Sequence, residues 1–123
     1  MNYLLDTHVY IWWSENSSKL KPEFKSAISN PKNKICISIV SLWEIAIKIA
    51  IKKLRLKDSI EKLSTLYDFE MLPLKTSHLL ALLKLPLLHK DPFDRMLVAQ
   101  AKSEKLKLLS NDPQVKQYFS QSK

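Results

Sequence analysis

Lys34-Ile35-Cys36-Ile37-Ser38, followed directly by Ile39-Val40-Ser41-Leu42-Trp43-Glu44-Ile45-Ala46-Ile47-Lys48, is the stretch that decides the fold class of this sequence. The run Ile35-Cys36-Ile37 is apolar at every position, as expected of a strand buried on both faces. The residues from Ile39 or Val40 to Lys53 are expected to form a long helix. A buried strand that leads straight into a helix is the building unit of a parallel sheet covered by helices.

The same alternation of strand and helix extends outward in both directions. We expect further strands at residues 2–5, 69–74 and 106–109, and helices at 9–13, 22–29, 59–67, 76–83, 92–104 and from 113 onward. Asp58, Thr76 and Asp91 are predicted as N-caps, because their side chains can accept hydrogen bonds from the first backbone amides of a helix. The pattern predicts a single domain over residues 1–123, of the α/β class, with a central parallel sheet of four to five strands in a three-layer α/β/α arrangement.

The composition fits one folded domain. Of the 123 residues, 46% are hydrophobic and 26% are charged, which supplies one core and argues against general disorder. No apolar run is long enough to cross a bilayer, and no basic segment precedes Leu4–Trp13 as it would in a signal peptide. Cys36 is the only cysteine, so an internal disulfide is excluded. We therefore expect a cytoplasmic protein without a membrane partner.

Charge and glycine content narrow the function classes. Twenty basic residues against 12 acidic ones give a formal net charge of +8, which attracts polyanions. Nucleic acid is the first candidate ligand and an acidic protein partner the second. The sequence has no glycine, hence neither a dinucleotide fingerprint nor a Walker loop, and we expect no nucleotide cofactor. Turns that need a left-handed residue must use others, with Asn16, Asn30 and Asn33 as candidates.

Five carboxylates are placed where they can converge. Asp6 directly follows the first strand, Asp112 follows the last one, and Glu44 lies one turn into the helix after the second strand. Asp91 and Asp94 open the helix that precedes the last strand. Sites in open α/β sheets form beyond the carboxyl ends of the strands, so these acids can meet there. Without a cation they would repel one another, and oxygen ligands favour Mg²⁺ or Mn²⁺.

Most of these acids also have a structural interpretation. Asp6 and Asp112 could cap the helices that follow them. Glu44 could form a helical ion pair with Lys48, four residues on, or be merely solvated. Asp91 precedes a proline, and we interpret it as a helix cap followed by proline at the first helical position.

Asp94 has the strongest independent case for a functional role. It shares one helix face with Leu97, Val98 and Ala101, so its carboxylate points toward the fold and needs a partner there. A charged group at the head of an apolar stripe is seldom explained by solvation alone.

The remaining polar and aromatic residues give weaker signals. The three histidines show no metal-ligand spacing: His8, His78 and His89. Two of them could serve as acid and base in a metal-free ribonuclease, which we consider the weaker alternative. His8 lies near the expected site and is interpreted as structural, with contact to the substrate as the alternative. The tryptophans are expected in the core, with a subunit or partner interface as the alternative: Trp12, Trp13 and Trp43. The basic residues between 48 and 57 are interpreted as a solvated helix end, with phosphate contact as the alternative.

Four motifs, in order along the chain, resemble those of one known family, the PIN-domain nucleases. They are Leu4-Leu5-Asp6-Thr7-His8 with Trp12-Trp13, Ser41-Leu42-Trp43-Glu44-Ile45-Ala46-Ile47-Lys48, His89-Lys90-Asp91-Pro92-Phe93-Asp94-Arg95, and Leu108-Leu109-Ser110-Asn111-Asp112. The similarity runs from residue 1 to about residue 118. Within the family, the sequence most resembles the VapC-type toxins of bacterial toxin–antitoxin pairs.

The resemblance implies a three-layer α/β/α fold and Mg²⁺- or Mn²⁺-dependent cleavage of RNA that leaves a 5′-phosphate and a 3′-hydroxyl. It implies four catalytic and metal-binding acids: Asp6, Glu44, Asp94 and Asp112. It also implies four supporting positions: Thr7, Ser41, Asp91 and Asn111. Such toxins form homodimers and are held inactive by a cognate antitoxin whose tail enters the active-site groove. Release of the toxin is expected to arrest translation or growth.

Two lysines depart from the family pattern. Lys53 and Lys105 stand where relatives often carry glycine after a helix. A left-handed lysine costs roughly 1 kcal/mol more than a left-handed glycine. We therefore expect these two turns to be built differently.

Two other classes of protein fit part of the pattern. A phosphoacceptor receiver domain has a similar length and alternation, but it needs an aspartate directly after the central strand, whereas Asp68 precedes a strand. A non-catalytic RNA- or partner-binding module on the same fold is the second alternative. The presence of all four acids argues against it.

Overall fold

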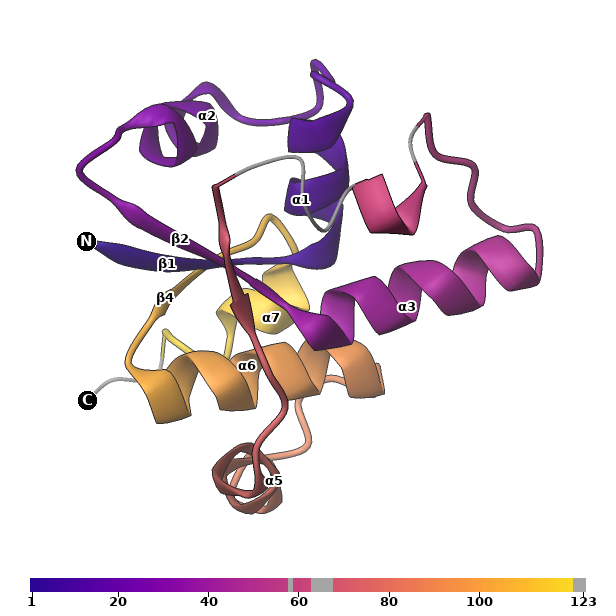
Figure 1. The fold of residues 1–123 in the computed structure, drawn as a ribbon. Coiled ribbons are helices and arrows are strands. Elements are labelled where there is room, and N and C mark those ends of the chain that lie inside the picture. The colour runs from indigo at the N-terminus through magenta and orange to yellow at the C-terminus, as the bar shows by residue number, and fades with distance from the viewer. Residues whose placement is uncertain (58, 63–67, 121–123) are drawn as a thin grey trace.

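The computed structural model describes residues 1–57, 59–62 and 68–120. Its centre is a four-stranded sheet in the order β3-β2-β1-β4, in which every neighbouring pair is parallel (Figure 1). The strands are β1 (Asn2–Leu5), β2 (Lys34–Ser38), β3 (Glu70–Leu72) and β4 (Lys107–Leu109). The predicted α/β class and parallel sheet are confirmed.

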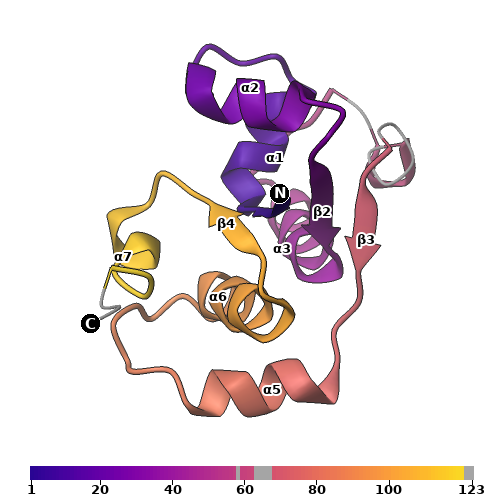
Figure 2. The same ribbon diagram turned by 90° about the vertical axis from the view of Figure 1, so that its left-hand side faces the viewer.

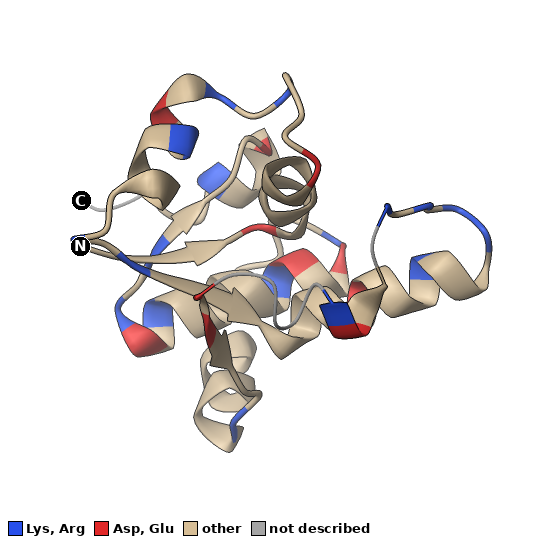
Figure 3. Ribbon diagram, turned by 45° about the horizontal axis from the view of Figure 1, so that its top comes forward, with Lys and Arg blue, Asp and Glu red and all other residues tan. Residues whose placement is uncertain are grey.

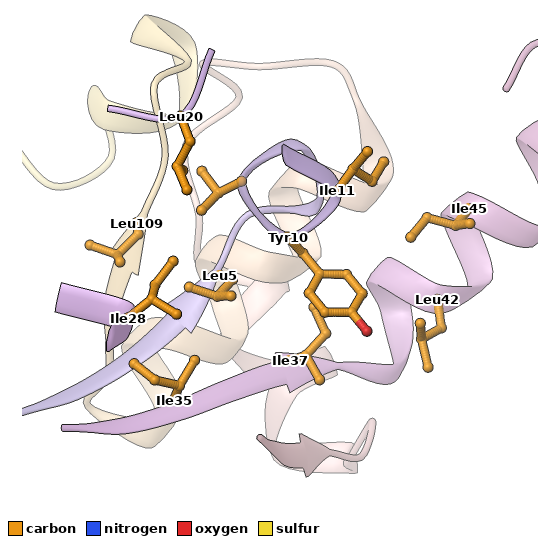
Figure 4. Packing of buried hydrophobic residues seen from close by; sticks show 11 residues of the cluster. Leu5, Tyr10, Ile11, Leu20, Ile28, Ile35, Ile37, Leu42, Ile45 and Leu109 are labelled. Carbon is orange, nitrogen blue, oxygen red and sulfur yellow. The ribbon is translucent and has the colours of Figure 1, made fainter. Parts of the chain in front are cut away.

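Helices cover both faces of the sheet (Figure 2). Their bounds are α1 (Thr7–Ser14), α2 (Pro22–Ser29), α3 (Ile39–Ala50), α5 (Thr76–Leu83), α6 (Pro92–Glu104) and α7 (Pro113–Lys116). Successive residues of a strand point to opposite faces, so Leu5 joins one core cluster and Leu4 another. The first cluster packs the sheet against α1, α2 and α3 (Figure 4), and the second packs it against α6. This is the predicted three-layer arrangement.

Most element boundaries match the sequence-based expectation, and the differences are local. The first helix begins at Thr7 rather than residue 9, α3 ends at Ala50 rather than Lys53, and β3 is three residues long. Thr76 is not the N-cap of α5. That cap is Lys75, whose backbone N–H donates to Nδ1 of the His78 ring at 3.0 Å. The predicted cap Asp58 and residues 63–67 of the predicted helix lie outside the described residues.

Because the sequence has no glycine, the left-handed backbone conformation at three turns is taken by other residues. Asn16, Lys52 and Lys105 have φ angles of 51°, 61° and 57°. Asn16 therefore confirms one expectation, whereas Asn30 has φ −74° and is not left-handed. Lys105 is fully left-handed, with ψ 43°, so the expectation that its turn would avoid this conformation was wrong. At the end of α3 the left-handed residue is Lys52 and not Lys53.

A buried polar network joins α5 and α6 to the end of β2. His78 is completely buried and its Nε2 lies 2.7 Å from the Glu104 carboxylate. Its Nδ1 accepts the Lys75 amide hydrogen, so the ring proton belongs on Nε2 and is donated to Glu104. Gln100 continues the network, because its Nε2 lies 3.2 Å from the ring and its Oε1 accepts from the Ser38 hydroxyl at 2.6 Å. The network fixes the two helices on this face of the sheet.

One of the three tryptophans differs from the prediction of a core position. Trp12 and Trp13 are half-buried against the first core cluster, but Trp43 is 57% exposed. Its ring contacts Phe93 edge-to-face, with centroids 5.1 Å apart.

Within the described residues, no helix is both long and apolar enough to span a membrane.

Candidate active site

Asp6 lies at the end of the central strand β1. Its backbone N–H donates to the Leu109 carbonyl at 3.0 Å, which continues the pairing of β1 and β4 by one residue. The residue is only 4% exposed. Oδ2 accepts a 2.6 Å hydrogen bond from Ser110, while Oδ1 is buried without a hydrogen-bond partner among the described residues. Burial raises the pKa of Asp6 above its usual range, and the Ser110 hydrogen bond opposes that rise.

Ser110 holds two of the acids in relation to each other. Its hydroxyl donates to Asp6 and accepts the backbone N–H of Asp112 at 3.1 Å. Ser110 belongs to one of the four quoted motifs, but it was not predicted as a site residue. Its position in the sequence was a usable signal. A serine directly after the last strand lies beside an acid that directly follows the neighbouring strand.

Glu44 is buried, contrary to the solvated alternative. It is 3% exposed and its Oε2 accepts from the Lys48 ammonium at 2.9 Å, so the predicted helical ion pair is present. This hydrogen bond is the main cause that raises the pKa of Lys48. The other oxygen, Oε1, has no hydrogen-bond partner in the part of the chain that the structure describes. The carboxylate therefore keeps one oxygen available.

Asp94 points into the fold, as its helical face predicted. Its Oδ2 lies 2.9 Å from Nε2 of His89. The pKa of Asp94 is raised to about 7, first by burial and then by the charges of Asp6 and Asp91, against the lowering effect of the His89 hydrogen bond. Glu44 adds a further repulsion. Such mutual repulsion shows that the acids gather in one place.

Asp91 and Asp112 are both helix caps. Oδ1 of Asp91 accepts the amide hydrogens of Phe93 and Asp94 at 2.8 and 3.1 Å, which confirms its predicted role. Oδ1 of Asp112 likewise accepts the amide hydrogen of Gln114 at 2.9 Å. Its second oxygen, Oδ2, lies 3.4 Å from His89 Nε2. Asp112 therefore caps α7 with one oxygen and faces the acids with the other.

The supporting residues lie around these acids. The Thr7 hydroxyl donates to the Ser41 hydroxyl at 2.9 Å, and this buried bond ties α1 to α3 beside the acids. Oδ1 of Asn111 is buried with no partner among the residues described. A hollow of about 320 Å³ is lined by Asp6, His8 and Asn111 together with Asp112 and apolar neighbours.

The donor set fits a hard divalent cation. Buried oxygens are normally hydrogen-bonded, yet here Asp6 and Glu44 each keep one oxygen without a donor in the described chain. In Figure 3 the acidic segments at the end of β1 and the start of α6 lie close together. Ligand atoms of His89, Asp94 and Asp112 lie within 4.8 Å of one another. Carboxylate oxygens in this arrangement are what Mg²⁺ and Mn²⁺ bind.

The sequence-based interpretations of two histidines need correction at this site. His89 shows no metal-ligand spacing in the sequence, but the fold brings its ring between Asp94 and Asp112. His8, which was interpreted as structural, is exposed and its ring lies 5.8 Å from the Trp12 ring. The structure thus places all four predicted acids at one sheet edge and adds a histidine and a serine to them.

The molecule is thus an α/β protein with a parallel sheet, and acids that could hold a cation lie at the carboxyl edge of that sheet. The chain belongs to the PIN domain family, which matches residues 3–119. The fold is similar to a chain of VapBC2 from Rickettsia felis, whose crystal structure was solved bound to a DNA fragment from their promoter. That match has a TM-score of 0.69 and 18% identity, and it covers 96% of this chain and 93% of the other. A comparison with curated proteins found no match.

Proposed function

We propose that the protein is a Mg²⁺- or Mn²⁺-dependent endoribonuclease in which Asp6, Glu44, Asp94 and Asp112 bind the metal. The observation that carries the proposal is the pair of donor-free buried oxygens, on Asp6 and Glu44, next to Asp94 with its raised pKa. Buried acids in this state are costly unless a cation joins them. Membership of the PIN domain family and the four acidic motifs support the same conclusion.

The residues of the chain have separate tasks in the proposed hydrolysis of a phosphodiester bond. A bound divalent ion supplies an activated water and stabilises charge on the scissile phosphate. Ser110 orients Asp6, and Lys48 orients Glu44, so that one oxygen of each stays directed to the site. Asp94 and Asp112 close the site from α6 and from the turn after β4. Asp91 acts on Asp94 through the backbone, by capping the helix that carries it.

Basic residues next to the acids can bind the phosphates of RNA. A hollow of about 290 Å³ beside the site is lined by Thr7 and His8 together with Lys19, Lys48 and Lys53. Lysines at such a place can contact the phosphates on either side of the scissile bond. The formal net charge of +8 strengthens this attraction over a longer range.

The proposed biological role is that of the toxin of a toxin–antitoxin pair. The role rests on the four motifs and on the likeness of fold to a chain from a VapBC2 complex. We propose that the protein forms a homodimer, acts in the bacterial cytoplasm, arrests translation or growth, and is inhibited by a cognate antitoxin. Trp43, exposed and packed on Phe93 next to Asp94, offers such a partner an apolar contact beside the site.

Removal of either central acid should abolish cleavage. We expect Asp6→Asn and Asp94→Asn to reduce the rate of RNA hydrolysis in Mg²⁺ or Mn²⁺ by at least about hundredfold, since even outer-shell changes at metal sites cost 10–100-fold. Glu70→Gln is the matched control. Glu70 lies on β3 and forms an ion pair with Lys34 on β2, away from the four acids. The measurement is the cleavage of labelled RNA, with folding checked by circular dichroism.

Two outcomes would contradict the proposal. If both folded variants cut RNA at the rate of the unchanged protein, the four acids are not the catalytic group. If the unchanged protein binds RNA but neither binds Mn²⁺ by calorimetry nor cuts, the fold is used here as a non-catalytic RNA-binding module.

A further inference from the structure

The geometry points to His89 as a nitrogen ligand that binds a divalent cation together with Asp94 and Asp112. We propose that this ligand makes the site favour Mn²⁺ over Mg²⁺. The inference deepens the proposed function and rests on it, because both require a divalent cation at these acids. It concerns a residue that the four-acid scheme does not include.

Three potential ligand atoms surround one small space. Nε2 of His89 lies 2.9 Å from Oδ2 of Asp94 and 3.4 Å from Oδ2 of Asp112. Neighbouring ligands around an octahedral ion are about 3 Å apart when each metal–ligand distance is near 2.1 Å. The separations in the structure are thus those of adjacent ligands of a single ion. A single N–H group, in contrast, can donate one linear hydrogen bond, and the contact at 3.4 Å is long for a second.

The backbone of His89 is held independently of the acids. The backbone amides of Leu88 and His89 donate to the Tyr118 hydroxyl at 3.1 and 3.0 Å. Tyr118 is buried in a core cluster with Val98 and Val115. The loop that carries His89 is therefore anchored to the segment that follows α7, and the ring itself is held by its contacts with Asp94 and Asp112. Preorganised ligands are what metal sites require.

The ring can present the lone pair that a metal needs. In the structure Nδ1 accepts a long hydrogen bond of 3.5 Å from the Asp91 backbone N–H, so the ring proton belongs on Nε2, which donates it to Asp94. A cation at Nε2 would shift this proton to Nδ1 at the cost of that one long hydrogen bond. A neutral imidazole with its proton on Nδ1 leaves Nε2 free to bind a cation. The ring is mostly buried, so a water has little room to take its place.

A nitrogen ligand changes the preference among metals. Mg²⁺ binds oxygen ligands almost exclusively, whereas imidazole suits first-row transition ions better. The two donor-free oxygens of Asp6 and Glu44 serve either ion, so they contribute little to the choice. His89 is the ligand that discriminates.

The test measures metal binding directly. Pulsed EPR of the Mn²⁺-loaded protein should show coupling to a directly bound nitrogen, and His89→Asn should remove it. By calorimetry, His89→Asn should weaken Mn²⁺ binding by about 10–100-fold and leave Mg²⁺ binding within about threefold. His8→Asn is the comparison variant, because His8 lines the same hollow as Asp6 and Asp112 but lies outside the ligand group, and this variant should keep the nitrogen signal.

The outcomes separate this inference from the proposed function. If Mn²⁺ binds and RNA is cut, but no nitrogen coupling is seen in the unchanged protein, His89 is not a ligand and the four-acid proposal stands. The same holds if His89→Asn weakens Mn²⁺ and Mg²⁺ equally. If the unchanged protein binds Mg²⁺ but no Mn²⁺, only this inference is overturned; if it binds neither ion, both conclusions are overturned.

Discussion

Asp94 is held in an environment that favours its protonated form. Burial and the charges of Asp6 and Asp91 raise its pKa from 3.8 to about 7. In the unfolded chain these influences are lost, so the unfolded protein releases this proton at a much lower pH. Between about pH 4 and pH 7 the folded, metal-free protein therefore holds more protons than the unfolded one, and its stability falls as the pH rises through this window. The raised pKa of Asp6 acts in the same direction.

The metal-free protein should consequently be more stable at pH 5.5 than at pH 7.5. We expect a higher urea midpoint at the lower pH in the presence of a chelator, and a smaller difference in Asp94→Asn. Glu104, whose pKa is lowered by His78 and Lys75, has the opposite effect, but it is lost only below its usual pKa of 4.5 and thus outside this range. Saturating Mn²⁺ should reverse the trend, because the metal binds the ionised acids. An equal or higher midpoint at pH 7.5 without metal would show that the acids do not repel.

The individual residues of the site were predictable to the extent that their roles are local. Asp91 could be recognised as a cap because a cap involves only the next three residues. Ser110 had only its place after the last strand as a signal, and His89 had none, since its contacts with Asp112 and Tyr118 come from distant parts of the chain. The backbone of His89 is held by Tyr118, 29 residues away, and no spacing in the sequence records that contact.

At the scale of elements, helix positions were predicted well and exposed faces less well. On α3, Ile39, Trp43 and Ile47 follow one another at steps of four residues and are exposed, whereas Val40 and Ile45 are buried. Because this helix is apolar on both sides, periodicity could not identify the buried side. That is the physical reason why Trp43 was wrongly expected in the core.

The left-handed lysine that ends α6 should be a source of strain. Lys105 has φ 57° and ψ 43°, a conformation that a side chain disfavours. We expect Lys105→Gly to increase the free energy of unfolding by about 1 kcal/mol, because glycine has no Cβ to clash there. Urea denaturation measures the change.

Lys84→Gly provides the matched comparison. Lys84 also follows a helix, α5, but its φ of −88° suits an ordinary residue. At this position glycine relieves no strain, and it should lower the free energy of unfolding because it gives the unfolded chain more conformational freedom. Equal effects at the two positions would mean that strain at Lys105 is absent.

At the scale of the whole molecule, the position of the basic residues should determine how RNA binding depends on salt. Lys19 and Lys53 line the hollow beside the acids, whereas Lys32 and Lys107 lie at the opposite, amino edge of the sheet. In an Asp94→Asn background, the double change Lys19→Ala and Lys53→Ala should reduce the slope of log affinity against log salt by about 1.4, at about 0.7 per phosphate contact.

Fluorescence anisotropy with a short single-stranded RNA at several salt concentrations measures this slope. The pair Lys32→Ala and Lys107→Ala removes the same charge from the other edge of the sheet and should leave the slope nearly unchanged. Equal reductions by both pairs would indicate that only the net charge of +8 matters and that no defined path for RNA exists.

The overall architecture followed from the regular alternation of strands and helices, but the strand order did not. The order β3-β2-β1-β4 places the first and last strands side by side, and each long crossover could have led to either edge of the sheet. That choice depends on how the helices pack on the two faces. Sequence patterns within single elements therefore do not determine the strand order.

The hydrogen bond between Ser110 and Asp6 joins residues 104 positions apart. During synthesis, the first acid emerges long before the serine that orients it and before Asp94 and Asp112. A growing chain therefore holds no complete cation site until its β4 segment has been made and has inserted beside β1. Long-range pairing of this kind is also slow. The proposed nuclease activity therefore cannot appear until nearly the whole chain has been made and folded.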